Sequence, residues 1–217
     1  MPSAVVPEAV RSLSVAMRED SRSEHDAAEH SSFMSELLGG RVNDQGYVDY
    51  LLRLRAVYRT LEDTVRAWRS DPVVAAFYDP MLERLATIDA DLDHWAPQGA
   101  RETDSPATRA YCDRIAESDW GGALVAHHYT RYLGDLSGGQ AIGRVLDRAF
   151  GLNGAGLSFY EFPMRPKPYK DGYRDRLDNL DLDQNGMGRV VDEVKVAFAL
   201  NQALFDELTA NLPAYRR

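Results

Sequence analysis

Two short segments contain residues whose types and spacing could support chemistry. In the first, His25 and Glu29 lie one helical turn apart, so that both side chains would share one face of a helix. A carboxylate in that position can accept a hydrogen bond from one imidazole nitrogen and leave the other nitrogen neutral and oriented for a metal ion. Considered alone, the pair is more typical of a solvated helix end carrying ordinary charges.

The second segment is the glycine-rich run 132–143, in which Asp135 is the acidic residue. The flanking pattern predicts a helix here, although each glycine costs a helix interior roughly 1 kcal/mol relative to alanine. A bend in the helix, or a close approach of its backbone to a large flat group, would explain that cost. The carboxylate in the same run suggests that the close approach also involves chemistry.

Together the two segments favour a haem site. A single imidazole suits a five-coordinate haem iron whose sixth position is open. Gly134 and Gly138 would let a helix pass close to a ligand on that iron, and Asp135 could hold a chain of water molecules that delivers protons to bound dioxygen. Further members of this polar network would be Arg131, Tyr58, Tyr111 and Asn201.

The carboxylate side chains of haem need cations at the edge of the pocket. Lys170 and Arg174 lie one turn apart and would share a helix face, Arg18 precedes His25 by one to two turns, and Tyr129 lies just ahead of the glycine run. A solvated helix face also explains each of these residues taken singly.

Other classes of site find less support. A di-iron carboxylate bundle needs paired Glu-x-x-His motifs, and the chain offers only Asp91 and His94 at that spacing. Zinc-protease, nucleophile-elbow and phosphate-loop motifs are absent from the sequence. The single cysteine, Cys112, excludes an internal disulfide, and a thiaminase-like hydrolase using it as nucleophile would lack an evident activating base.

Composition limits the protein class. With 217 residues, 44% hydrophobic and 27% charged, the chain can form one domain over residues 1–217 with a full core. The net charge of −9 argues against binding to nucleic acid. We see neither a secretory signal nor an apolar stretch near the ~20 residues of a membrane helix, so we expect a cytoplasmic protein without a membrane anchor.

The elements that must position these residues are predicted to be helices throughout. The expected helices cover residues 6–23, 31–38, 45–70, a short piece after 71–72, 79–95, 106–117, 121–150 with an interruption at the glycines, 170–179 and 184–212. Residues 158–161 are the one stretch predicted to be extended. The predicted fold class is therefore all-α: a single-domain helical bundle with a kinked helix above the site.

Longer strings within these segments resemble the haem oxygenase family, in particular the soluble bacterial type of actinobacteria. The resemblance runs nearly end to end and is strongest over residues 24–34 and 126–140, the second string being highly specific. Phe159 and Tyr160, residues 169–174 and residues 198–201 add to it.

The resemblance implies a role for each candidate residue. His25 would be the proximal haem ligand with Glu29 as its hydrogen-bond partner, and Asp135 would organise the distal water network. The remaining assignments are Gly134 and Gly138 over the haem, Arg131, Tyr58, Tyr111 and Asn201 in the network, Arg18, Tyr129, Lys170 and Arg174 on the propionates, and Phe198 in the haem pocket. Arg18 departs from related sequences, which often carry lysine there; the charge is kept but the geometry differs.

The resemblance also implies the reaction. Haem b would be both cofactor and substrate, cleaved at a meso carbon, expected to be α, to biliverdin, carbon monoxide and ferrous iron. Dioxygen and electrons from a separate reductase or ferredoxin would be consumed, and iron acquisition is the expected purpose. We expect a monomer. A haem carrier or sensor without turnover, and a helical scaffold without chemistry, are the alternatives.

Overall fold

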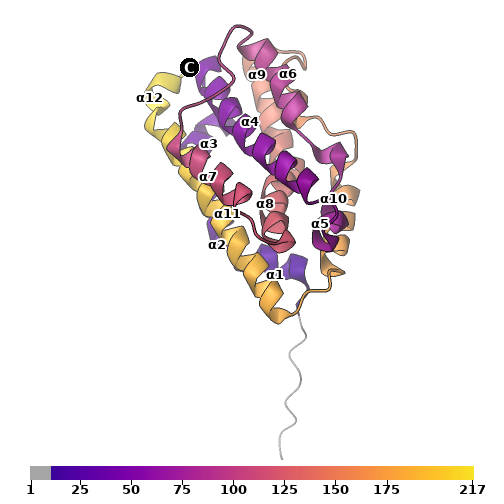
Figure 1. Cartoon of the computed structure of the whole chain (residues 1–217). Coiled ribbons are helices and arrows are strands. Elements are labelled where there is room, and N and C mark those ends of the chain that lie inside the picture. The colour runs from indigo at the N-terminus through magenta and orange to yellow at the C-terminus, as the bar shows by residue number, and fades with distance from the viewer. Residues whose placement is uncertain (1–10) are drawn as a thin grey trace, which may run out of the picture.

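Helices make up most of residues 11–217, the part of the chain that the computed structural model describes (Figure 1). They are α1 (Leu13–Asp20), α2 (Arg22–Glu29), α3 (Ser32–Leu38), α4 (Asp44–Ala67), α5 (Pro72–Phe77), η1 (Pro80–Leu82), α6 (Leu85–Trp95), α7 (Pro106–Ala116), α8 (Gly121–Gly134), η2 (Asp135–Gly139), α9 (Gln140–Phe150), η3 (Ser158–Tyr160), α10 (Pro166–Asp178), α11 (Gln184–Ala210) and α12 (Leu212–Tyr215). Within these residues the only β pairing is one isolated bridge between Val42 and Arg216. The predicted all-α fold is confirmed.

Short polar side chains set where several helices begin. The Asn43 side chain accepts a hydrogen bond from the backbone N–H of Gly46 at 2.9 Å, and Ser105 caps α7 by accepting from Thr108 at 3.1 Å. Each such cap satisfies a backbone donor that the helix itself leaves free. These starts agree with those predicted from the sequence.

The core is rich in tyrosine. Long helices α4, α8 and α11 pack against each other and against α7 (Figure 1). Tyr47, Tyr58 and Tyr111 are among the fully buried side chains. A buried phenol brings a hydroxyl that must find a hydrogen-bond partner. The interior of this bundle therefore needs a polar network beside its apolar packing.

The prediction of one continuous helix over residues 6–23 is wrong in the part that the structure describes. Residues 6–10 lie outside the described part of the chain. The chain turns at Ser21 (φ −108°, ψ 13°), so that α1 ends at Asp20 and α2 starts afresh at Arg22. The Ser21 hydroxyl donates to the Met17 carbonyl at 2.6 Å, a local bond that competes with the helical ladder. The turn gives α2, which carries His25, its own direction.

Two further boundaries differ from prediction. The expected helix 79–95 is divided at Glu83, because the buried Glu62 carboxylate caps α6 by accepting from the backbone N–H groups of Arg84 and Leu85 at 2.5 and 3.0 Å. The segment 158–161, expected to be extended, begins with the single turn η3, whose N–H groups donate to the Asp91 carboxylate at 2.8 Å. In both cases a carboxylate distant in sequence decides the local structure.

Helix α10 begins earlier than predicted, at Pro166 rather than at Lys170. Proline suits the first helical turn because its fixed φ matches the helix and its missing N–H is not needed there. At the other end of the chain, α11 ends at Ala210 and the short α12 follows. Lys170 therefore lies in the second turn of α10, with Arg174 one turn beyond it.

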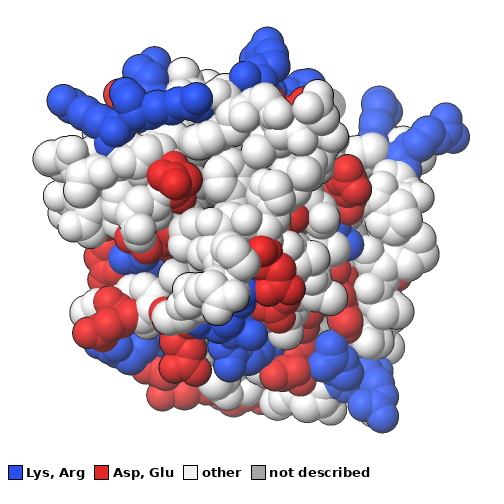
Figure 2. All heavy atoms as spheres, turned by 90° about the horizontal axis from the view of Figure 1, so that it is seen from above, with Lys and Arg blue, Asp and Glu red and all other residues white. Residues whose placement is uncertain are grey.

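Charges of both signs are spread over the surface. Figure 2, which views the end of the bundle from above, shows Lys and Arg side chains gathered at the margins of this face and Asp and Glu side chains scattered between uncharged areas. The net charge of −9 therefore does not make this face uniformly acidic. In residues 11–217 we find no helix with an apolar stretch sufficient to cross a bilayer.

We expect His128 to make the protein sensitive to acid. This α8 side chain is buried, and burial, with the nearby Arg176 charge, lowers its pKa to about 3. The unfolded chain binds a proton there near pH 6.5, so unfolding takes up a proton between these two values. Stability is then complete above about pH 6.5 and falls as pH drops, by up to about 1.4 kcal/mol per pH unit.

Urea unfolding at pH 7.5 and pH 5.5 checks this expectation. The variant His128→Asn should lose less stability between the two pH values than the parent protein does, whatever its stability at pH 7.5. An equal loss in both proteins would assign the acid sensitivity to other groups.

Candidate active site

The predicted kink above the site takes the form of a π-helical turn. Between α8 and α9, residues Asp135–Gly139 form η2, in which the backbone bonds span one residue more than in an α-helix. A Cβ atom placed on Gly134 or Gly138 would meet no atom within 4 Å. The two glycines thus border open space, whereas Gly143 in α9 packs tightly against Tyr160.

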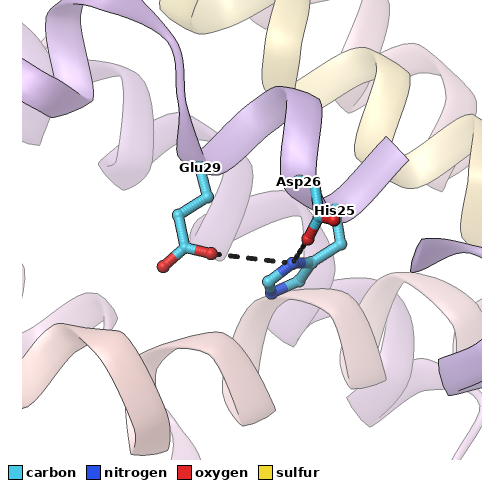
Figure 3. Close-up of side chains that lie close together, drawn as sticks. All are labelled: His25, Asp26 and Glu29. Atoms are coloured by element: carbon cyan, nitrogen blue, oxygen red, sulfur yellow. Dashed lines mark hydrogen bonds and ion pairs between the residues drawn. The ribbon is translucent and has the colours of Figure 1, made fainter. Parts of the chain in front are cut away.

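On the opposite side of that space, α2 presents His25. Figure 3 shows the imidazole extending from the helix, with two carboxylates directed at the same ring nitrogen. The Nδ1 atom lies 3.3 Å from an Asp26 oxygen and 3.7 Å from a Glu29 oxygen. The ring also packs edge-on against Phe198 of α11, with centroids 5.5 Å apart. Since both carboxylates approach Nδ1, Nε2 is the nitrogen available to a metal ion.

The predicted partner of His25 is thus only partly as expected. At 3.7 Å, Glu29 approaches Nδ1 but lies outside hydrogen-bonding distance, and Asp26 is the nearer carboxylate. Sequence reasoning overlooked Asp26 because neighbouring residues on a helix do not normally face each other. The signal that could have identified Asp26 was its position directly after His25 in the sequence.

A cavity of about 530 Å³ separates α2 from the glycine turn. Eleven of the predicted site residues line it: Arg18, His25, Glu29, Tyr129, Arg131, Gly134, Asp135, Gly138, Arg174, Phe198 and Asn201. Sequence reasoning missed Tyr50, Thr130 and Phe205, which also line it. These residues lie on long helices, where only tertiary packing determines whether a buried side chain faces a cavity or the rest of the core.

Behind Asp135 lies a continuous polar network. The Tyr58 hydroxyl donates to the Asp135 carboxylate, and Arg131 donates to the Tyr58 oxygen at 3.3 Å and to the Asn201 side-chain oxygen at 2.6 Å. Asn201 in turn donates to the Tyr111 hydroxyl at 3.5 Å. Tyr58 and Tyr111 do not line the cavity but support residues that do, so the structure brings the predicted network together from four α-helices and the π-turn η2.

Burial shapes the acidity of this network. Removal from water raises the pKa of Asp135 above its ordinary value, although the Arg131 charge and the Tyr58 hydrogen bond oppose the rise. Burial also raises the pKa of Tyr58 well above its usual range, so that this phenol remains a hydrogen-bond donor. The cavity therefore has a carboxyl group that takes up protons more readily than a free aspartate.

Cations gather at the edge of the cavity. Arg174 lines it from α10 and pairs with Asp171 at 3.3 Å, while Arg18 lines it from α1 and lies 3.4 Å from Glu19. Lys170 does not line the cavity, but its Nζ donates at 2.8 Å to the hydroxyl of Ser137, which does. Burial and the Arg174 charge lower the pKa of Lys170. Arg18 and Arg174 can therefore meet an anionic group inside the cavity, and Lys170 lies at its margin.

Cys112 offers no sign of an activated nucleophile. It is half-buried on α7, and burial raises the pKa of its thiol. Nucleophilic cysteines show the opposite shift, because a nearby cation or base favours the thiolate. The structure gives no support to the hydrolase alternative.

We expect Gly138→Ala to have opposite effects on stability and on ligand binding. Because a Cβ there meets nothing, alanine should raise the free energy of unfolding by about 0.5–1 kcal/mol. The same methyl group would occupy the open space beside the cavity and weaken the binding of a flat ligand. Chemical denaturation and haem titration measure the two effects. Gly188→Ala in α11, also unobstructed but away from the cavity, is the matched control and should change only stability.

Comparisons with known proteins agree with this geometry. The family model described as "Heme oxygenase" matches residues 11–207. The chain is 38% identical to heme oxygenase 1 of Rattus norvegicus, covering 92% of this chain and 72% of the rat protein. It is 35% identical to heme oxygenase 1 of Synechocystis, covering 92% of this chain and 86% of that one.

Solved structures give the same result. The crystal structure of Synechocystis heme oxygenase-1 in complex with heme superposes with a TM-score of 0.88 at 34% identity, covering 94% of this chain and 95% of that one. Heme oxygenase from Leptospira interrogans superposes with a TM-score of 0.86 at 35% identity, covering 91% and 100%. With an all-helical fold, a histidine facing a glycine turn and these relatives over most of its length, the chain belongs to the haem oxygenase family.

Proposed function

We propose that this protein is a haem oxygenase that cleaves haem with dioxygen and external electrons to biliverdin, carbon monoxide and ferrous iron. The observation that carries this proposal is the placement of His25 and the glycine turn on opposite walls of one cavity. The wall carrying Gly134 and Gly138 has space where side chains would otherwise lie, which fits a flat macrocycle. Residues 1–217 would form one haem oxygenase domain.

His25 would hold the iron through Nε2. Its other nitrogen faces the Asp26 and Glu29 carboxylates, which would keep the proton on Nδ1 and orient the ring. Phe198 packs against the imidazole and limits its rotation. When bound, haem supplies the iron centre at which dioxygen is reduced and the meso carbon that is oxidised.

Asp135 would govern proton delivery on the opposite face. Tyr58 donates to one of its carboxylate oxygens and Arg131 lies 3.6 Å from the other, so that the carboxyl group is held in place from behind. Because Asp135 lines the cavity, its remaining hydrogen-bonding capacity would be available to water there. Beside it, the glycine backbone at Gly134 and Gly138 leaves open space in which a small molecule would fit.

The cationic edge would hold the haem propionates. Arg18, Tyr129 and Arg174 line the cavity, and Lys170 is joined to it through Ser137. This seating favours cleavage at the α-meso carbon. The same region would dock a reductase or ferredoxin, since α10 and the residue before it carry a basic group on an otherwise acidic protein. That group comprises Arg165, Lys167, Lys170, Arg174 and Arg176.

The remaining parts of the proposal concern context. We propose a monomer in the cytoplasm that releases iron from haem for the cell. The single cysteine suits a reducing compartment.

The test is a spectrum of the purified protein with one equivalent of hemin, followed after a reductant is added in air with catalase present. Loss of the haem absorption with the rise of biliverdin absorption is the expected result, and chromatography would identify the isomer. A stable complex that alternates between ferric and oxygen-bound forms without losing haem would instead indicate a carrier or sensor.

A further inference from the structure

A buried histidine connects two of the helices that frame the cavity, although the histidine itself does not line the cavity. His128 of α8 and Tyr173 of α10 are both almost fully buried. The His128 Nδ1 atom and the Tyr173 hydroxyl share a hydrogen bond of 2.9 Å, and the two rings lie parallel within 4° at a centroid distance of 5.7 Å. Among the described residues this is the hydrogen bond that links α10 directly to α8.

The residues that follow each partner do line the cavity. Tyr129 comes directly after His128, and Arg174 comes directly after Tyr173. Successive side chains on an α-helix project about 100° apart, so a contact that fixes one of them also fixes the direction of the next. The His128–Tyr173 contact therefore sets the rotation of two helices at the point where each presents a side chain to the cavity.

Other contacts around His128 hold it in one orientation. Its ring packs against Phe77 of α5 at 4.7 Å and against Tyr132 at 4.3 Å. On the α10 side, Arg176 donates to the Ala76 carbonyl of α5 at 2.9 Å. Three helices thus meet around one imidazole, and a side chain without a polar atom in its place would leave the Tyr173 hydroxyl buried and unpaired.

We propose that the His128–Tyr173 contact is a positioning element that sets how Tyr129 and Arg174 meet the carboxylate groups of the substrate, and thereby which meso carbon faces Asp135. The inference rests on the proposed haem oxygenase function. It assigns a role in substrate seating to a pair that touches neither the substrate nor the reacting atoms. The affected ligand groups are the two propionates rather than the macrocycle.

Tyr173→Phe tests the contact with the smallest change, since it removes only the hydroxyl. A lost hydrogen bond of ordinary strength corresponds to about a two- to tenfold effect on binding. We expect haem to bind about that much more weakly, and a second biliverdin isomer to appear in the product. Binding of haem dimethyl ester, which lacks the carboxylate charges, should be unchanged. KM for haem should rise while kcat changes little.

Two further variants separate positioning from general stability. Tyr215→Phe is the matched control, because its hydroxyl donates to Asp49 at 2.5 Å and neither residue lines the cavity. It should lower the melting temperature without altering the isomer or the preference for haem over its ester. His128→Asn, whose amide can still bond to Tyr173, should form the same biliverdin isomer as the parent protein. His128→Phe, which cannot make this bond, should behave like Tyr173→Phe.

A single parent isomer and an unchanged preference for haem over its ester in both Tyr173→Phe and His128→Phe would overturn the inference. That outcome would leave the proposed function intact as long as the parent protein forms biliverdin. If the parent protein forms none, the proposed function itself fails, and the two results are therefore distinguishable. Should Tyr173→Phe fold poorly, the comparison of His128→Asn with His128→Phe decides the question in the same way.

Discussion

Replacing Asp135 with alanine should leave haem bound but reduce biliverdin formation by about two to four orders of magnitude. The magnitude follows from the usual contribution of a positioned acid–base group. Haem binding should persist because the contacts that seat it come from His25 and the cationic edge. Without the carboxyl group, water in the cavity would lose its hydrogen-bond acceptor, and the delivery of protons there would no longer be restrained. Peroxide-dependent oxidation of an added phenol should therefore rise.

The product yield per haem, measured by absorption and chromatography, decides this prediction. Asp192→Ala is a suitable control, since it removes an equal charge from α11 at a side chain that is 79% exposed. Tyr58→Phe should give an intermediate loss, because it leaves the Asp135 carboxylate in place without its donor. An unchanged biliverdin yield in Asp135→Ala would remove this residue from the mechanism.

Replacing His25 with alanine should abolish turnover and strongly weaken haem binding. The imidazole side chain is 53% exposed, so its loss should cost little folding stability, and the effect would be confined to the haem complex. Resonance Raman spectroscopy should show the iron–imidazole stretch in the parent protein and not in the variant. Added free imidazole should partly restore the parent spectrum by entering the space that the side chain leaves.

His30→Ala serves as the control for this prediction. His30 is also exposed and close in sequence, but its Nδ1 bonds to the Asp26 carbonyl at 2.7 Å and it does not line the cavity. The His30→Ala variant should keep both the iron–imidazole stretch and the formation of biliverdin. Persistence of the iron–imidazole stretch in His25→Ala would mean that another histidine is the ligand.

Much of this site could be predicted because its signals are local. His25 with Glu29, and Asp135 among the glycines, each lie within a single helical segment, where spacing determines which side chains share a face. The network of Tyr58, Arg131 and Asn201 draws on three helices; the sequence offered these residues as candidate members, and the family resemblance implied the same set. The structure then brought these residues into hydrogen-bonding contact.

The remaining features depend on tertiary contacts that no local pattern reports. The break before α2 depends on a hydroxyl that bonds back to Met17, and the start of α6 depends on Glu62 from another helix. Tyr50 and Thr130 line the cavity, yet their sequence context is that of ordinary core residues. The extended conformation predicted for 158–161 failed for the same reason, since Asp91 caps a turn there.

The π-turn η2 also determines how the chain tolerates insertions and deletions. An additional residue in a helical ladder rotates everything after it by about 100°. Helix α9 buries Ile142 and Leu146 only in the register that this extra residue provides. Deleting one residue from the turn would restore a regular helix and swing that apolar face away from the core. The number of residues in this turn is therefore fixed by the packing of the helix that follows, independently of the chemistry of its side chains.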